Sequence, residues 1–349
     1  MRQPAAPYHE SLVAAEVRAI CGEHGISVKA DQFGNLYAVV KNGEGSSGPV
    51  VLAAHMDHPG FEIVRRLGVG RWEARFLGGV PERYFQPGLE LKLQPTGGLA
   101  MLGKRLPHKR EKRFELREDC PGTERPEFAV WNLREFAVRD GRIRARVCDD
   151  LIGVAVIIGT LIELKRTRSR CHVIGFISRA EEVGFQGALA AAGAGLIPRR
   201  SLVISLETSK EIPGVKMGDG VIVRVGDRSS VFDSRGTRFL TEMGDRLGKR
   251  DDFRYQRALM AGGSCEGTAF QEFGYRTAAV CVALGNYHNC GRGDRIREEF
   301  VSLDDSLGMR QLLVESARRY VDFDSAVGRT RVRLDRLRKE GERRLRRQG

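Results

Sequence analysis

Acidic side chains at the ends of apolar runs constrain this sequence more than any other feature. Three places hold them: the pair Asp149–Asp150, the pair Glu181–Glu182 and the single Glu207. The neighbouring runs are apolar enough to form buried strands, or helices that pack on them. A carboxylate at the mouth of a buried strand is costly unless a cation lies beside it. We therefore expect cations to lie beside these acidic side chains.

Two histidines occupy comparable positions. His55 follows the apolar run 50–54, and His288 comes shortly after the run 277–283. Asp57 lies two residues beyond His55, and an extended chain places such a pair on one face. In open α/β sheets, ligands bind at the carboxyl ends of the strands. We therefore predict that the two histidines and the three acidic places converge on two divalent metal ions.

The adjacent glutamates suit a division of labour. One can bind metal while the other takes a proton from a metal-bound water. Two ions about 3.5–4 Å apart generate hydroxide at neutral pH and polarise a carbonyl oxygen, so the set predicts a hydrolase. Taken alone, Asp149–Asp150 could instead be a pair of acids at a helix N-terminus, and Glu181–Glu182 could be an exposed turn. In the metal-site hypothesis, Asp149 bridges the two ions while Asp150 holds the loop or orients a neighbour.

Strands that alternate with helices predict an α/β fold, in which helices cover both faces of a sheet. Short alternating runs between Gly/Pro-rich turns indicate a small β-rich unit in the middle of the chain. We predict that this unit, at 64–146, is an inserted domain that divides a catalytic domain into two segments, 1–63 and 147–325. A helical Arg-rich tail is predicted to follow at 326–349.

Charge and cysteines bear on partners and compartment. The net charge is +13, and residues 327–349 hold ten Arg/Lys against three Asp/Glu. No zinc-finger spacing, RNP pattern or aromatic–basic interleaving accompanies this charge, so a solvated tail helix is preferred over a nucleic-acid site. Seven scattered cysteines without a C-x-x-C motif favour a reducing compartment. No apolar signal core or membrane-spanning run occurs, and we predict a cytoplasmic protein.

At this point the sequence resembles the M42 family of di-metal aminopeptidases, within the wider clan of zinc exopeptidases. The matching motifs run in order from Tyr8 to about Tyr320. They are Asp31 with 33–36, His55-Met56-Asp57 with 59–61, Asp149-Asp150 with Gly153, Glu181-Glu182-Val183-Gly184 with 187–188, Glu207-Thr208 with 213–214 and 218–220, Gly262-Gly263-Ser264, and His288.

The resemblance implies a mixed-sheet aminopeptidase domain with an inserted β-barrel-like domain, and homo-oligomers assembled through that insertion. It implies that one ion, zinc first and cobalt or manganese otherwise, takes His55, Asp149 and Glu207. The second ion takes Asp149, Glu182 and His288. Glu181 is implied as the general base, and Asp57 as the residue that orients a ligand histidine. The substrate would be a short peptide.

The sequence departs from the family pattern near these residues. Glu207 stands where many relatives have aspartate, and Ser264-Cys265-Glu266-Gly267 replaces a usual Thr-Asp-Ala-Gly. Two other hypotheses therefore stay open. One is a related di-metal amidohydrolase, such as a deacylase or a carboxypeptidase. The other is a non-catalytic or RNA-binding scaffold that uses the basic tail.

Overall fold

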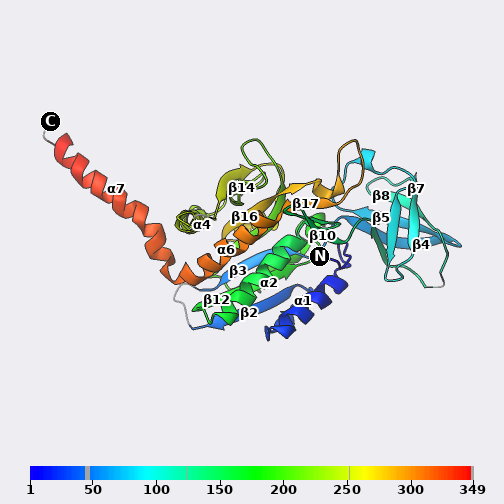
Figure 1. Ribbon diagram of the computed structural model, residues 1–349, viewed down its shortest axis with the longest axis horizontal. Helices are drawn as coiled ribbons and strands as arrows, with labels where there is room; N and C mark the ends of the chain where they lie inside the picture. Colours follow the sequence, from blue (N-terminus) through cyan, green and yellow to red (C-terminus); the bar gives the residue numbers. More distant parts are fainter. Residues whose placement is uncertain (44–47, 123, 251, 347–349) are drawn as a thin grey trace.

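The computed structural model describes residues 1–43, 48–122, 124–250 and 252–346. Figure 1 shows a main body with a small β unit at one end and a single helix projecting from the other. The helices are α1 Ser11–Glu23, α2 Leu151–Arg166, α3 Gln186–Gly193, α4 Ser234–Leu247, α5 Glu266–Glu272, α6 Leu303–Arg319 and α7 Phe323–Leu345.

In the described residues, eleven strands form a large mixed sheet in the order β1-β2-β12-β3-β13-β16-β17-β11-β10, with β14 pairing to β16 and β15 to β14. Their bounds are β1 Val28–Ala30, β2 Leu36–Asn42, β3 Val50–His55, β10 Phe136–Arg139, β11 Arg142–Ala145, β12 Cys171–Ser178, β13 Leu202–Lys210, β14 Val221–Asp227, β15 Tyr255–Met260, β16 Arg276–Gly285 and β17 Glu299–Ser302.

The centre of the large sheet is buried on both faces. Strands β12, β3, β13 and β16 run parallel to one another, and all six residues of β3 are buried. Helices α2 and α6 pack on one face (Figure 1), and α3 and α5 pack on the other. A Cβ added at Gly175 of β12 would lie 2.6 Å from Ile157 of α2, so helix and sheet are in close contact there. Burial on both faces explains why these strands are continuous apolar runs.

Six further strands close into a barrel in the order β4-β5-β8-β7-β6-β9. Their bounds are β4 Gly60–Gly68, β5 Arg71–Leu77, β6 Glu90–Gln94, β7 Leu99–Leu106, β8 Lys112–Glu118 and β9 Phe128–Trp131. The barrel has its own core, which includes Phe61, Phe76, Phe114 and Trp131. A mixed α/β sheet between helices was the predicted fold class, and the structure confirms it.

The predicted domain limits differ in detail from the strand pairing. Strands β10 and β11 lie inside the range 64–146, yet β11 pairs with β17 of the large sheet and not with the barrel. The barrel also begins earlier, at Gly60. Short alternating strands look alike in sequence whichever sheet they join, because pairing depends on distant partners. The limits at 63 and 146 therefore remain predictions.

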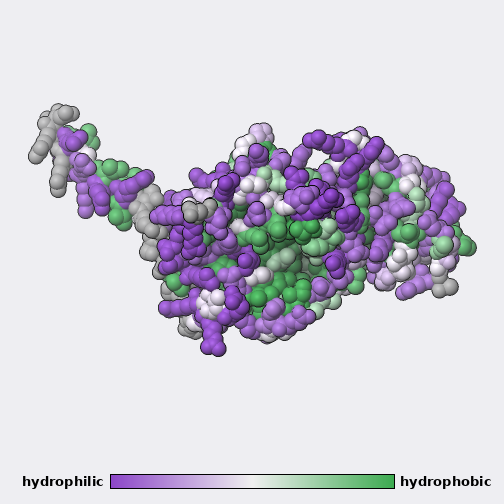
Figure 2. All heavy atoms as spheres, viewed as in Figure 1, coloured by the Kyte–Doolittle hydropathy of each residue, from purple (hydrophilic) through white to green (hydrophobic). Residues whose placement is uncertain are grey.

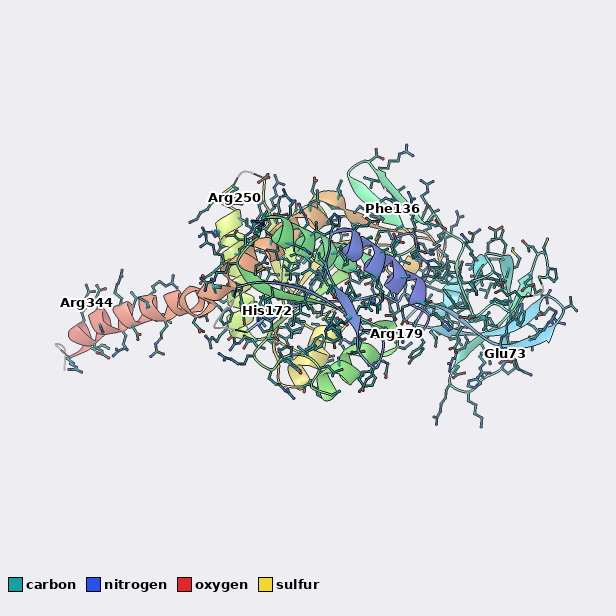
Figure 3. All side chains as sticks on the ribbon, turned by 90° about the horizontal axis from the view of Figure 1, so that it is seen from below. Glu73, Phe136, His172, Arg179, Arg250 and Arg344 are labelled. Atoms are coloured by element: carbon teal, nitrogen blue, oxygen red, sulfur yellow. The ribbon has the colours of Figure 1, made fainter. Side chains whose placement is uncertain are left out.

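Helix α7 projects away from the body, and hydrophilic side chains predominate along it (Figures 1 and 2). Figure 3 labels Arg344 on this helix and Glu73 on the barrel, at opposite ends of the molecule. Ion pairs such as Arg331–Asp335 and Arg338–Glu342 lie along its surface at helical spacing. The tail predicted to be helical forms this helix up to Leu345; residues 347–349 lie outside the described residues. Within the described ranges, every helix is too short or too polar to span a bilayer.

Candidate functional site

Parallel pairing in the large sheet brings the predicted residues to one edge. In the register of β12 with β3, Ser178 lies opposite His55, and Glu181 and Glu182 follow directly in a short 3₁₀ turn. Strand β13 pairs with β3 on its other side and continues to Glu207. The carboxyl ends of three neighbouring strands therefore meet, as the sequence predicted.

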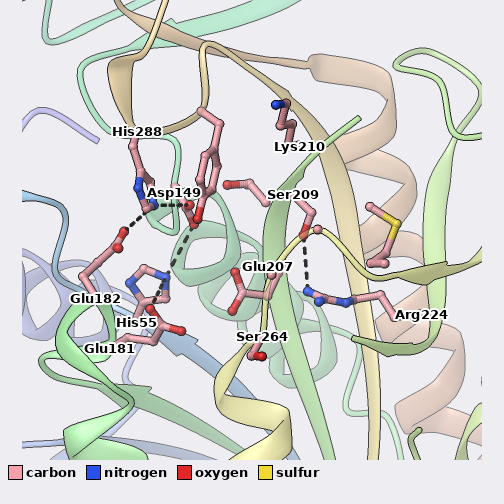
Figure 4. A pocket seen from close by; sticks show the side chains of 15 residues that line it. His55, Asp149, Glu181, Glu182, Glu207, Ser209, Lys210, Arg224, Ser264 and His288 are labelled. Carbon is pink, nitrogen blue, oxygen red and sulfur yellow. Dashed lines mark hydrogen bonds and ion pairs between the residues drawn. The ribbon is translucent and has the colours of Figure 1, made fainter. Parts of the chain in front are cut away.

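The loops before α2 and after β16 deliver the remaining residues. His55 Nε2 lies 3.5 Å from Asp149 Oδ1, and His288 Nε2 lies 3.6 Å from Asp149 Oδ2. His288 Nε2 is also 3.1 Å from Glu182 Oε1. Figure 4 shows Asp149 between the two histidines. The structure thus brings together all five residues that were predicted to bind metal.

Two groups of possible ligand atoms share Asp149. One contains His55, Asp149 and Glu207, and the other contains Asp149, Glu182 and His288; within each group the atoms lie within 4.8 Å of one another. A carboxylate common to two such groups can bridge two cations through its two oxygens. These two groups are the ones that the family resemblance implies. A third group contains His55, Glu181 and Glu182, so the predicted base also lies within reach of a cation.

Asp57 lies beneath the glutamate turn and is fully buried. Its two carboxylate oxygens accept hydrogen bonds from the backbone N–H groups of Glu181, at 2.9 Å, and Glu182, at 3.1 Å. Asp57 Oδ1 is 3.6 Å from His55 Nδ1, and the Asp57 carbonyl oxygen is nearer to that nitrogen, at 3.1 Å. Asp57 therefore contacts the predicted ligand histidine and also holds the turn that carries the predicted base.

Two residues outside the predicted set support the site. Glu299 is fully buried, and its carboxylate accepts hydrogen bonds from the backbone N–H groups of Asp149, at 3.0 Å, and His288, at 2.8 Å. His58 lies 2.8 Å through Nδ1 from the carbonyl oxygen of Asp149 and 3.0 Å through Nε2 from Asn289 Oδ1. An acid in the short strand β17 was the only sequence signal for Glu299.

Asp150 caps the helix that follows it. Its Oδ1 accepts a hydrogen bond of 3.0 Å from the Gly153 N–H, which caps the N-terminus of α2. Of the two adjacent aspartates, only Asp149 belongs to the groups of possible ligands. The alternative interpretation as an N-terminal helix acid therefore applies to Asp150 and not to Asp149.

The electrostatics of the cluster show an excess of buried acid. Burial raises the pKa of Glu207, and the charges of Glu181 and Asp149 raise it further. Burial alone would lower the pKa of His288, but Glu182 and Asp149 raise it to about 10. Burial likewise opposes protonation of His55, whose pKa is nevertheless raised by Glu181 and Asp149. Both histidines are thus drawn toward the charged form by carboxylates.

The donor set fits divalent cations. Asp149 Oδ1, Glu182 Oε1 and Glu207 Oε1 are buried and, among the described residues, form no hydrogen bond of normal geometry. Buried carboxylate oxygens without donors are rare in folded proteins and call for an ion or water. Mixed histidine and carboxylate ligands suit zinc and also accept cobalt or manganese.

A cavity of about 90 Å³ opens onto the cluster (Figure 4). One wall carries cations: Arg224, only 3% exposed, donates from Nη1 to Ser209 Oγ at 3.2 Å, and Lys210 follows along β13. Arg224 Nε is buried and forms no hydrogen bond within the described residues.

A second cavity of about 420 Å³ shares Lys210 and Tyr287 with the first and is bordered by residues 79–84 beside the barrel. The sequence did not predict the buried arginine in the strand 221–225.

The model of the M42 glutamyl aminopeptidase family matches residues 121–294. Solved structures that share the fold include the following three. A TET1 peptidase of Pyrococcus horikoshii is 22% identical, with a TM-score of 0.75 over 90% of this chain and 96% of that one. An aminopeptidase of Desulfurococcus kamchatkensis is 20% identical, with a TM-score of 0.75 over 93% and 94%. A TET aminopeptidase of a marine-sediment Thaumarchaeota archaeon is 18% identical, with a TM-score of 0.76 over 91% and 94%.

Proposed function

Since this chain belongs to the M42 family of metal-dependent aminopeptidases, we propose that it removes the N-terminal residue from short peptides with Glu181 as general base. The observation that carries the proposal is the pair of ligand groups that share Asp149, with Glu181 beside them. The site is built from strand ends of the large sheet, so its geometry is fixed by the most buried part of the fold.

One ion would be held by His55, Asp149 and Glu207, and the other by Asp149, Glu182 and His288. Bound there, two divalent ions supply Lewis acidity for the scissile carbonyl and acidify water. Nε2 of each histidine faces Asp149, while Nδ1 of His288 lies 2.8 Å from the Gly79 carbonyl oxygen. Such a hydrogen bond fixes the tautomer that leaves Nε2 free to bind a metal.

Glu181 would transfer a proton from the attacking water to the departing nitrogen. Its carboxylate lines the cavity, and Oε2 lies 3.9 Å from His55 Nε2. An oxygen of Glu181 takes a proton from the attacking water and then delivers it to the nitrogen of the departing peptide. Burial raises the pKa of Glu181; His55 opposes this, and the nearby Glu182 and Asp57 raise it further. A raised pKa favours retention of the proton between the two steps.

Arg224 indicates the preferred substrate. A buried guanidinium without a carboxylate partner is costly, and a carboxylate from the substrate would complete its hydrogen bonds. Arg224 lies in the wall beside Glu207, and the matched family is described as glutamyl aminopeptidases. We therefore expect preference for an acidic N-terminal residue, whose side chain would reach Arg224 and Ser209.

The assembly and compartment are proposals as well. The TET1 peptidase of P. horikoshii assembles into a tetrahedron or a large octahedral shell. We expect this chain to form a homo-oligomer too, with the barrel as the contacting unit. All seven cysteines are free thiols, which suits a cytoplasmic protein.

The test uses the purified chain with elemental analysis and an aminoacyl p-nitroanilide panel. We expect about two divalent ions per chain and chelator-sensitive hydrolysis. The substitution Glu181→Gln should lower kcat by roughly 10³-fold while the metal content stays unchanged. An unchanged rate in this variant would contradict the assignment of the base. Turnover of N-acyl amino acids alone would favour the deacylase hypothesis.

A further inference from the structure

The turn that carries Glu181 is held by side chains from distant parts of the sequence. The backbone N–H groups of Glu181 and Glu182 donate to Asp57, as described above. The two preceding N–H groups are also held: Arg179 N donates to Asn35 Oδ1 at 3.1 Å, and Ala180 N donates to Glu10 Oε1 at 3.0 Å. Four consecutive backbone donors thus end on side chains, and Glu10 supplies the acceptor from outside the metal cluster.

Glu10 stands just before helix α1 and is only 1% exposed. Besides the Ala180 N–H, its Oε1 accepts the N–H of Tyr8 at 2.8 Å. Its Oε2 forms an ion pair with Arg179 Nε at 2.7 Å. A single buried carboxylate therefore joins the N-terminal segment to the segment that leads into the catalytic turn.

Arg179 extends the same connection. Its Nη1 donates to the carbonyl oxygen of Phe33 at 3.1 Å, and its Nη2 donates to that of Tyr8 at 2.8 Å. Figure 3 labels Arg179 on the side of the main body that faces the barrel. With three of its nitrogens bound to the N-terminal third of the chain, the guanidinium has little freedom to move.

The backbone explains why the turn requires such support. Ala180 has φ +52° and Phe185 has φ +57°, so two residues other than glycine adopt the left-handed region within six positions. Such conformations cost about 1–3 kcal/mol each and persist only where the surroundings enforce them. Without Glu10, the Ala180 N–H loses its acceptor, and this left-handed residue loses one of the contacts that hold it in place.

We propose that Glu10, through Arg179 and the Ala180 N–H, is a positioning residue that fixes the carboxylate of Glu181 for proton transfer. The inference rests on the proposed function, since it takes Glu181 as the base. It adds that the N-terminal segment is a working part of the active site, although Glu10 touches neither the cavity nor the groups of possible metal ligands.

The experiment compares Glu10→Ala and Glu10→Gln with the unmodified chain. For Glu10→Ala we expect kcat to fall by about 10²-fold with KM within about twofold, because small displacements of a catalytic group cost rate. Amide hydrogen exchange in residues 180–183 should accelerate, and the metal content should stay the same. Glu10→Gln keeps an acceptor for Ala180 but places an NH₂ group against Arg179. It should show a smaller loss, and it carries the test if the alanine variant does not fold.

Glu315→Ala is the matched control. Glu315 is also a buried glutamate, 9% exposed, with an arginine partner, Arg246, at 2.9 Å, but it belongs to helix α6. We expect this variant to lower Tm while kcat and exchange in residues 180–183 stay unchanged. The proposal is overturned if Glu10→Ala and Glu315→Ala lower kcat equally. It is also overturned if Glu10→Ala leaves kcat and amide exchange unchanged, or if Glu10→Ala releases metal. An unchanged rate in Glu181→Gln would instead contradict the assignment of the base, on which this inference rests.

Discussion

The barrel and the active site both bury glutamates, and the two regions treat them in opposite ways. In the barrel, Glu115 is fully buried and accepts from Arg71 Nε at 2.6 Å and from Arg117 Nε at 3.2 Å. In the site, Glu207 is 6% exposed, and its Oε1 has no donor among the described residues. Both glutamates have little solvent-exposed area, but Glu115 is covered by the exposed side chains of Arg71 and Arg117, whereas Glu207 lies deep in the site.

The pKa values of Glu115 and Glu207 are shifted in opposite directions. The Arg117 and Arg71 guanidinium groups lower the pKa of Glu115. Burial, with Glu181 and Asp149 beside it, raises the pKa of Glu207. The barrel therefore neutralises its buried acids with cations from the chain, whereas the site leaves the neutralising charge to be supplied from outside. That contrast is what we expect where a metal ion supplies the neutralising charge.

Equivalent substitutions in the two regions should have opposite effects. Glu207→Gln removes a ligand, so we expect activity to fall by roughly 10³-fold, while the metal-free protein becomes more stable because an unpaired buried charge is gone. Glu115→Gln should leave activity intact and cost about 1 kcal/mol of stability, since it weakens charged hydrogen bonds to exposed arginines. Denaturant unfolding of chelator-treated protein, with parallel kinetics, measures both. Destabilisation of both metal-free variants would break the comparison.

Arg224 reverses the contrast, because among the described residues this buried cation forms no ion pair with a carboxylate, although the charges of Glu207 and Asp227 act on it. We expect Arg224→Met to lower kcat/KM for a glutamyl anilide by about 10²-fold, the loss of a charged hydrogen-bonded contact. For a leucyl anilide the change should stay within about threefold. The ratio of the two kcat/KM values is the measurement. An equal loss on both substrates would mean that Arg224 supports the pocket and does not select the substrate.

The smallest expected effect is on pH dependence. Burial raises the pKa of Glu266 from 4.5 to about 7 in the folded state. A raised folded-state pKa gives stability that is present below pH 4.5 and is lost as the pH rises through about 7. We expect the free energy of unfolding of metal-free protein to fall across that window by on the order of 1 kcal/mol for such a group. The Tm should fall with it. Bound metal should reverse the trend, because ligands bind metal when deprotonated. Thermal melts of both forms against pH test this expectation.

Much of this architecture could be predicted from local pattern. Strands β3, β12, β13 and β16 are continuous apolar runs, and a strand buried on both faces requires such a run. The five candidate ligands were found because ligand-type residues follow those runs, and because the order of motifs resembles a known family. What the sequence could not predict is which short strand joins which sheet: β11 resembles a barrel strand and pairs with β17 instead.

The residues missed have a common physical reason. Glu299 and Glu10 each accept a hydrogen bond from a backbone N–H more than 100 positions away, from Asp149 and Ala180 respectively. Arg224 is marked by its burial, which only the folded chain creates. A glutamate at the first position of a short strand, or just before a helix, has no local feature that marks it as buried. Strand β15 was missed as well, because its pattern of polar and apolar residues is that of an edge strand.

The carboxylate of Glu299 has a consequence for how the site fills. One of its oxygens holds the backbone of Asp149, which belongs to both ligand groups, and the other holds the backbone of His288, which belongs to one. A shift of Glu299 therefore moves the donors of both positions at once. Substitution of Glu299 should accordingly weaken metal binding at both positions together, and not at one of them alone.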